Sequence, residues 1–164
     1  MNSIMKKLNL QEVRDFISRT SESTKIYLGS DSERYIFNEL WYADYTLAAV
    51  IHYDGCRGCK IFGEVQTERD YDQRKDRPRF RLMNEVHKVA GLYLELAEAI
   101  GDRHFEIHLD INSDEKQGSN CVMQEAIGYI RGMRNVVPMI KPRASAAPYA
   151  ADRYKSIVRA SSYA

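Results

Sequence analysis

The stretch KIYLGSD, residues 25–31, is short and apolar until it reaches Gly29, Ser30 and Asp31. An apolar run of this length that stops at turn-forming residues is typical of a buried strand. A later stretch, FEIHLDI at residues 105–111, alternates apolar and polar side chains and carries Asp110 near its end. These two stretches predict strands that end in aspartates. They are the first and the fourth predicted strands of the chain, and their aspartates become neighbours if the two strands lie side by side.

Helical and strand patterns fill the rest of the chain. Asn9 and Glu12 form a capping-box pattern at the start of a short N-terminal helix. Further strands are predicted over residues 41–52, 60–67 and 136–140, and the Asp-Gly pair within residues 53–58 predicts a hairpin turn. Further helices are predicted from about 78 to 100, from near 119 to 133, and from 148 to about 159. The first of these carries an apolar stripe at spacings of three and four: Leu82, Val86, Val89, Tyr93, Leu96 and Ile100.

This order of elements predicts an α/β fold. After the leading helix it reads β-β-β-α-β-α-β-α, so the first three strands suit an antiparallel meander and the later strands suit parallel pairing. We therefore expect a mixed five-stranded sheet with helices on its faces. Residues 1–24 are expected to form an N-terminal helix and lead-in, and residues 25–164 the main domain.

The composition is that of one soluble folded domain. The chain has 164 residues, of which 44% are hydrophobic, 10% aromatic and 29% charged. Disorder is excluded by the aromatic and aliphatic content, and no apolar run is long enough to span a membrane or to serve as a signal peptide. Three cysteines do not form a secreted disulfide framework, so we expect a cytoplasmic protein.

The net charge of +1 conceals an uneven distribution. Residues 131–164 carry a net charge of +6, whereas residues 1–130 carry −5. A basic C-terminal segment favours a polyanionic partner such as nucleic acid. A solvated basic surface explains the charge equally well.

Four carboxylates stand out by position: Asp31, Glu85, Asp110 and Asp152. Each has an ordinary explanation, because aspartates are common at strand ends and helix starts and a glutamate at a helix edge can reach water. Together they suggest a site, because ligands gather at the carboxyl ends of strands in open α/β sheets. Such an acidic cluster suits Mg²⁺ or Mn²⁺, and two such ions promote phosphodiester hydrolysis. Lys141, Arg143 and Arg153 are the expected phosphate contacts.

The local strings YLGSDS, HLDINSDE and KPRASAAPYAADRY resemble those of a small family of ribonuclease H-like nucleases from bacteria and their phages. The resemblance covers about residues 25–159. It implies the strand order 3-2-1-4-5 and a two-metal active site. It carries the acids of the ribonuclease H-like superfamily onto Asp31 in the first strand, Glu85 in the helix, Asp110 in the fourth strand and Asp152 in the last helix.

The sequence departs from ribonucleases H at two points. Ser32 follows the first aspartate where a glycine is common, and the loop before Asp152 contains no histidine. These departures weigh against cleavage of RNA–DNA hybrids, and the substrate stays open among DNA, RNA and hybrids. The resemblance implies a metal-dependent nuclease. The alternative is a catalytically silent nucleic-acid-binding or protein-interaction module on the same fold. The oligomeric state is open.

Two other patterns have a plain interpretation. Cys56 and Cys59 follow His52 at a spacing compatible with zinc, but a structural zinc site needs a fourth ligand, so a plain hairpin is favoured. The charged segment 68–81 could stack on a base or contact phosphates, and a solvated loop is the favoured interpretation.

Overall fold

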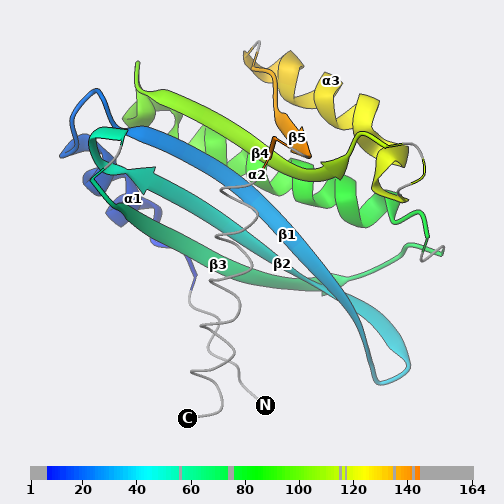
Figure 1. Cartoon of the computed structure of the whole chain (residues 1–164). Helices are drawn as coiled ribbons and strands as arrows, with labels where there is room; N and C mark the ends of the chain where they lie inside the picture. The colour runs from blue at the N-terminus through cyan, green and yellow to red at the C-terminus, as the bar shows by residue number, and fades with distance from the viewer. Residues whose placement is uncertain are drawn as a thin grey trace.

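The computed structural model describes residues 7–55, 57–73, 76–114, 116, 118–134, 136–141, 143 and 144. Its strands form one mixed sheet in the order β3-β2-β1-β4-β5 (Figure 1). β1 pairs antiparallel with β2 and parallel with β4, β2 pairs antiparallel with β3, and β4 pairs parallel with β5. The predicted fold class and strand order are therefore confirmed. The expected boundary between residues 24 and 25 stays a prediction.

The elements follow the predicted order. The strands are β1 (Lys25–Phe37), β2 (Leu40–His52), β3 (Cys59–Arg69), β4 (His104–Asn112) and β5 (Met139–Lys141). The helices are α1 (Leu10–Ser18), α2 (Arg79–Ile100) and α3 (Met123–Arg134), with 3₁₀ turns at Tyr53–Gly55 and Gly118–Val122. The third helix thus begins with a 3₁₀ turn, and the last strand is shorter than predicted. The predicted helix from 148 to 159 lies outside the described residues.

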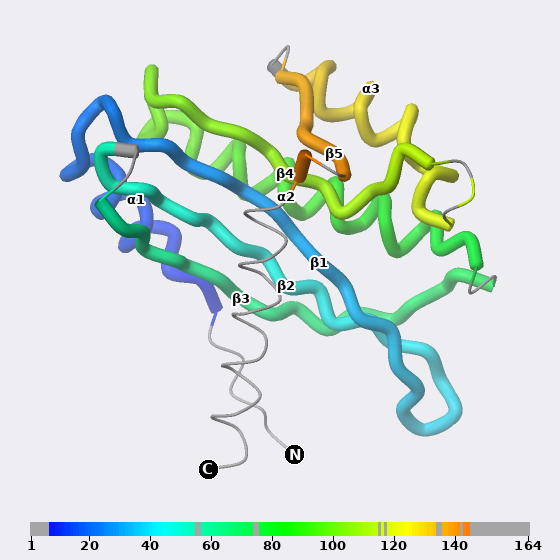
Figure 2. Tube along the Cα trace, viewed as in Figure 1, coloured from blue at the N-terminus to red at the C-terminus, as the bar shows by residue number. Residues whose placement is uncertain are grey.

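The sequence pattern indicated that the first strand ends at Asp31, and this prediction is wrong. β1 continues to Phe37 and pairs with β2 along its whole length, and in Figure 2 this hairpin extends beyond the other strands. The turn is made by Asn38 and Glu39, both with positive φ (48° and 64°). Because this turn has no glycine or proline, it lacks the usual sequence signal of a hairpin.

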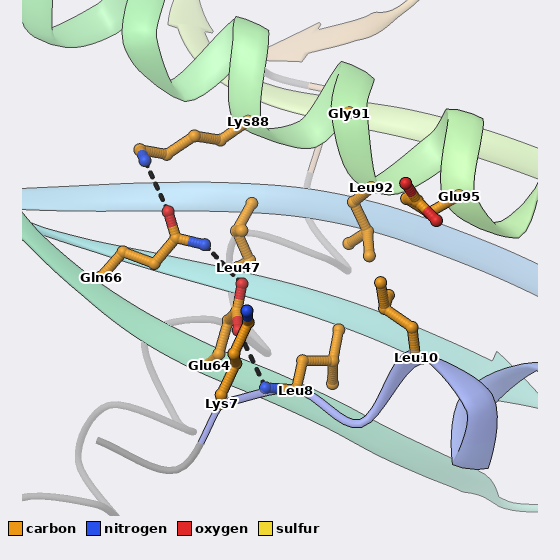
Figure 3. A pocket seen from close by; sticks show the side chains of 10 residues that line it. All are labelled: Lys7, Leu8, Leu10, Leu47, Glu64, Gln66, Lys88, Gly91, Leu92 and Glu95. Atoms are coloured by element: carbon orange, nitrogen blue, oxygen red, sulfur yellow. Dashed lines mark hydrogen bonds between the residues drawn. The ribbon is translucent and has the colours of Figure 1, made fainter. Parts of the chain in front are cut away.

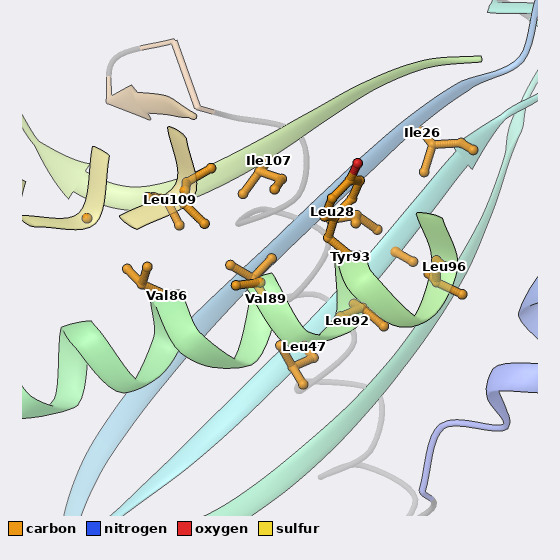
Figure 4. Packing of buried hydrophobic residues seen from close by; sticks show 14 of the residues in the cluster. Ile26, Leu28, Leu47, Val86, Val89, Leu92, Tyr93, Leu96, Ile107 and Leu109 are labelled. Atoms are coloured by element: carbon orange, nitrogen blue, oxygen red, sulfur yellow. The ribbon is translucent and has the colours of Figure 1, made fainter. Parts of the chain in front are cut away.

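The hydrophobic core lies between the sheet and the described helices. The apolar stripe of α2 packs on residues of β1, β2 and β4, as Figure 4 shows for Val86, Val89 and Leu96. α1 adds the fully buried Val13 and Ile17 to this core. α3 adds Ala126 and Ile130, and the 3₁₀ turn before it adds Val122. Burying each large aliphatic side chain contributes about 1.5–3 kcal/mol, so this layer fixes α2 firmly over the sheet.

The lead-in to α1 is held by a polar chain beside a cavity of about 280 Å³ (Figure 3). Lys88 donates to Gln66, Gln66 donates to Glu64, and Glu64 accepts the Leu8 backbone N–H at 2.8 Å. Lys88, Gln66 and Glu64 therefore form one hydrogen-bonded chain that ends on the backbone before α1. At the start of α1, Asn9 accepts the Glu12 N–H, which confirms the predicted cap.

The segment between β3 and α2 is only partly the solvated loop that its charge favoured, because buried aspartates alternate with exposed residues. Asp70 and Asp72 are both buried. The Asp72 carboxylate accepts the backbone N–H groups of Phe80 (2.8 Å) and Arg81 (2.9 Å), so it caps α2 from a loop position. Arg34 of β1 forms an ion pair with Asp70 at 2.7 Å and donates to the Asp72 carbonyl oxygen. Local sequence patterns do not predict that Asp70 pairs with Arg34, because the two residues are far apart in the sequence.

Replacing Asp72 by Ala is expected to lower the free energy of unfolding by about 1–3 kcal/mol, because two N–H groups of α2 lose their acceptor. Urea unfolding followed by circular dichroism measures this change. Asp102→Ala is the matched control, because Asp102 is exposed just after α2, and it should change stability by less than about 0.5 kcal/mol. Equal stability of the two variants would contradict the capping role.

Candidate active site

Asp31 and Asp110 lie next to each other at the end of the β1–β4 ladder. The parallel pairing runs from Lys25 opposite His104 to Ser30 opposite Leu109, so the next residue on each strand is one of the two aspartates. β1 continues past this point alongside β2, while β4 runs on beside β5. The adjacency of the first and fourth strands, which the family resemblance implied, is therefore confirmed.

Glu85 approaches the same point from α2 and is almost completely buried. Ser32 donates its hydroxyl to Glu85 Oε1, and Ser30 Oγ donates to the Glu85 carbonyl oxygen at 3.2 Å. Side chains alternate along a strand, so Ser30 and Ser32 face α2 while Asp31 lies on the other face of β1. The aspartates and Glu85 therefore approach the ladder end from opposite sides of the sheet.

Arg81 lies one helical turn before Glu85 and completes a polar chain. Its Nη1 donates to Ser32 Oγ at 2.5 Å and to the Ser32 carbonyl oxygen at 3.0 Å, and lies 3.9 Å from Glu85 Oε1. This chain from Arg81 through Ser32 fixes the orientation of the Glu85 carboxyl. Sequence analysis missed both residues in this role, although Ser32 was noted as a departure and Arg81 lay in the charged segment.

The pKa of Glu85 is raised to about 8. Burial is the largest cause, and the negative charges of Asp31 and Asp110 raise the pKa further, while the Ser32 hydroxyl and Arg81 lower it. Asp31 and Asp110 are therefore close enough to Glu85 to act on it electrostatically. A buried acid with this surrounding is the kind of group found at functional sites.

The folded-state pKa of Glu85 lies above its ordinary value of 4.5, so the folded protein binds the extra proton. Its contribution to stability is complete below pH 4.5 and is lost as the pH rises toward 8. In EDTA, we expect the wild type to lose at least about 1 kcal/mol relative to Glu85→Gln between pH 5 and pH 8. Urea unfolding at several pH values measures this difference.

Glu98→Gln is the control for that titration, because Glu98 is exposed on the same helix. The difference in unfolding free energy between wild type and this variant should stay constant with pH. A constant difference for Glu85→Gln as well would show that Glu85 has an ordinary pKa in the folded protein.

Lys141, an expected phosphate contact, lies beside one of the predicted carboxylates. Its ammonium forms an ion pair with Asp110 Oδ1, so in this structure it neutralises a carboxylate. Asp110 Oδ1 is shielded from solvent and accepts no hydrogen bond of normal geometry within the described residues. Arg143 is exposed, two residues beyond β5. Asp152 and Arg153 lie outside the described residues.

Thr46 is a further residue of this region that sequence analysis did not single out. It pairs directly with Asp31 across the β1–β2 ladder, so the two side chains lie on the same face of the sheet. Thr46 is fully buried, and its hydroxyl has no hydrogen-bond partner within the described part of the chain.

The chemistry of the donors suits a hard divalent cation, because all three acids offer oxygen ligands. Within the described residues, however, no three His, Cys, Asp or Glu side chains are arranged closely enough to hold a metal ion. His108 does not join the carboxylates; it is buried, and its Nε2 lies 2.7 Å from Glu106. Cys59 is free and exposed, and Cys56 lies outside the described residues.

A family model described as ribonuclease H-like matches residues 9–156 of the chain. No curated protein and no solved structure matches it. Among the helices of the described residues, none has the length and hydrophobicity needed to cross a membrane.

Proposed function

The chain belongs to the ribonuclease H-like family, and from this premise we propose that it is a metal-dependent nuclease that hydrolyses phosphodiester bonds of nucleic acid. The observation that carries the proposal is the place of Asp31 and Asp110 side by side at the end of the β1–β4 ladder, with the buried Glu85 reaching the same end of the ladder from α2 on the other face of the sheet. Burial raises the pKa of Glu85 most, and the negative charges of Asp31 and Asp110 raise it further, so a cation near these acids would be favourable.

We propose Asp31, Glu85 and Asp110 as ligands of Mg²⁺ or Mn²⁺, with Asp152 as the fourth carboxylate. The oxygen donors of these side chains support this assignment. Two divalent cations at such a site would activate water and stabilise the leaving oxygen. Ser32 and Arg81 hold the Glu85 carboxyl in place, so they are positioning residues.

Basic residues near the carboxylates are proposed to contact the substrate. Lys141 already lies at Asp110, and Arg143 follows two residues later. We propose that Lys141 and Arg143 bind phosphates of the scissile strand, and that Arg153, which lies outside the described residues, does the same. In this proposal, Lys141 moves from Asp110 to a phosphate oxygen when substrate binds.

A catalytically silent binding module is the second candidate function. It is favoured by the Lys141–Asp110 ion pair, which satisfies a proposed metal ligand with a protein cation. The described residues also lack a formed metal-binding cluster. Such a module would bind nucleic acid in EDTA, with an affinity that falls steeply as salt rises.

A cleavage screen distinguishes the two functions. Labelled single strands, duplexes, RNA–DNA hybrids and a four-way junction are incubated with the protein in Mg²⁺, Mn²⁺ or EDTA. Cleavage that requires the metal supports the nuclease and identifies its substrate. Binding in EDTA without cleavage of any substrate in either metal would support the silent module.

A further inference from the structure

A groove with an unusual lining adjoins the proposed site along the first turns of α2. It encloses about 300 Å³, at the lower end of the range for small-molecule sites. Its walls come from β2, the end of β3, the segment after β3 and the start of α2. The lining residues are Tyr45, Glu68, Arg69, Asp70, Tyr71, Phe80, Arg81, Met83, Asn84 and His87.

Two aromatic rings at this groove are open to solvent. Tyr71 is 71% exposed and Phe80 is 63% exposed, although large aromatic side chains normally bury most of their surface. The Arg69 guanidinium lies 5.7 Å from the centre of the Tyr71 ring. An exposed ring with an arginine beside it is a suitable platform for stacking a nucleobase.

The charges of the lining are compatible with a nucleic acid. Arg69 and Arg81 bring two positive charges to the groove, and Glu68 and Asp70 bring two negative charges. Glu68 is paired with Lys88, and Asp70 is paired with Arg34. The acids therefore do not carry unpaired charge that would repel a nucleic acid.

The groove is linked to the proposed catalytic carboxylates through Arg81. This residue lines the groove and also lies 3.9 Å from Glu85 through its Nη1 atom. Arg81 lies one helical turn before Glu85, so a nucleotide that contacts Arg81 in the groove would lie close to Glu85.

We propose that this groove binds an unpaired nucleobase next to the cleavage site, so that the preferred substrate contains a single-stranded stretch. This inference rests on the proposed function, because it specifies the substrate of that site. Bases in a continuous duplex have both faces covered by their neighbours, so Tyr71 and Phe80 can stack only on an unstacked base.

The test is fluorescence anisotropy with the full chain in EDTA, which separates binding from cleavage. The probes are a labelled single strand of about 16 nucleotides, an abasic strand of the same length, and a blunt duplex. The abasic strand keeps the phosphates and removes the bases. We expect the wild type to bind the normal strand more tightly than the abasic strand.

Tyr71→Ala and Phe80→Ala are each expected to weaken single-strand binding about 5- to 150-fold, with little change for the abasic strand. Tyr71→Phe and Phe80→Tyr keep a ring and should retain binding. Leu94→Ala is the control, because Leu94 is 61% exposed on α2 and does not line the groove. The inference would be overturned if both alanine variants bound the normal strand as tightly as the wild type does. It would also be overturned if the wild type bound the normal and abasic strands equally tightly.

Parallel cleavage assays keep this inference separate from the proposed nuclease. One outcome is that both alanine variants cleave duplex in Mg²⁺ as the wild type does and that binding does not depend on the bases. This outcome would reject base binding in the groove and support the nuclease. Base-dependent binding that needs Tyr71 and Phe80, without cleavage, would support the groove and reject the nuclease.

Discussion

Asp31→Asn is expected to reduce metal-dependent cleavage by at least about 1,000-fold while leaving the protein folded. The substitution keeps the size and shape of the side chain but removes a negative charge beside the β1–β4 ladder end. The proposed site needs that charge to hold a divalent cation. The sheet does not depend on it, since the β1–β2 pairing opposite Thr46 is made by backbone groups.

Initial rates on the best substrate of the cleavage screen measure this effect, and unfolding curves show that the variant is intact. Asp110→Asn should cause a loss of the same order, because the two aspartates occupy consecutive places on paired strands. Asp102→Asn is the control, because this exposed aspartate lies in the turn before β4. Full activity of both Asp31→Asn and Asp110→Asn would remove the proposed site.

The fold was predictable from local patterns because most elements carry their own signals. The stripe of α2 and the cap at Asn9 identify two helices, and the alternation in residues 105–111 identifies β4. The extension of β1 to Phe37 was not predictable in the same way. It depends on pairing with β2 across a turn of two residues with positive φ but without glycine.

The candidate site was predictable only in its outline. Parallel strands with aspartates at equivalent places predict that Asp31 and Asp110 meet, and the apolar stripe predicts that Glu85 points inward. The polar partners of these acids come from tertiary packing. Ser32 lies 53 residues before Glu85 in the sequence, so no local pattern links the two. Lys141 lies in β5, and the periodicity of a strand does not show that its ammonium pairs with Asp110.

Arg34→Ala is expected to lower the free energy of unfolding by about 3–5 kcal/mol, which is the largest stability change we predict. Arg34 Nε lies 2.7 Å from Asp70 Oδ2, and the side chains of Arg34 and Asp70 are only 11% and 1% exposed. Removing the arginine leaves a buried carboxylate without its cation. It also removes the hydrogen bond to the Asp72 carbonyl and the guanidinium 4.0 Å above the Trp41 ring.

Two comparisons separate this buried pair from an ordinary ion pair. Arg57→Ala breaks an exposed pair with Asp54 (3.9 Å) and should change stability by less than about 1 kcal/mol. The double replacement Arg34→Met with Asp70→Leu should recover part of the loss, because no buried charge is then left unpaired. If Arg34→Ala were as mild as Arg57→Ala, Asp70 would have to reach water or another cation.

The same pair links stability to the proposed groove. Asp70 and Asp72 flank Tyr71, and Asp72 caps the helix that begins at Arg79. Arg34 therefore anchors the segment that presents Tyr71 and starts the helix that carries Phe80. Single-strand binding by Arg34→Ala should consequently fall even at temperatures where the variant is fully folded. The double replacement Arg34→Met with Asp70→Leu should restore stability more than it restores binding, because the Asp72 carbonyl still lacks the arginine donor.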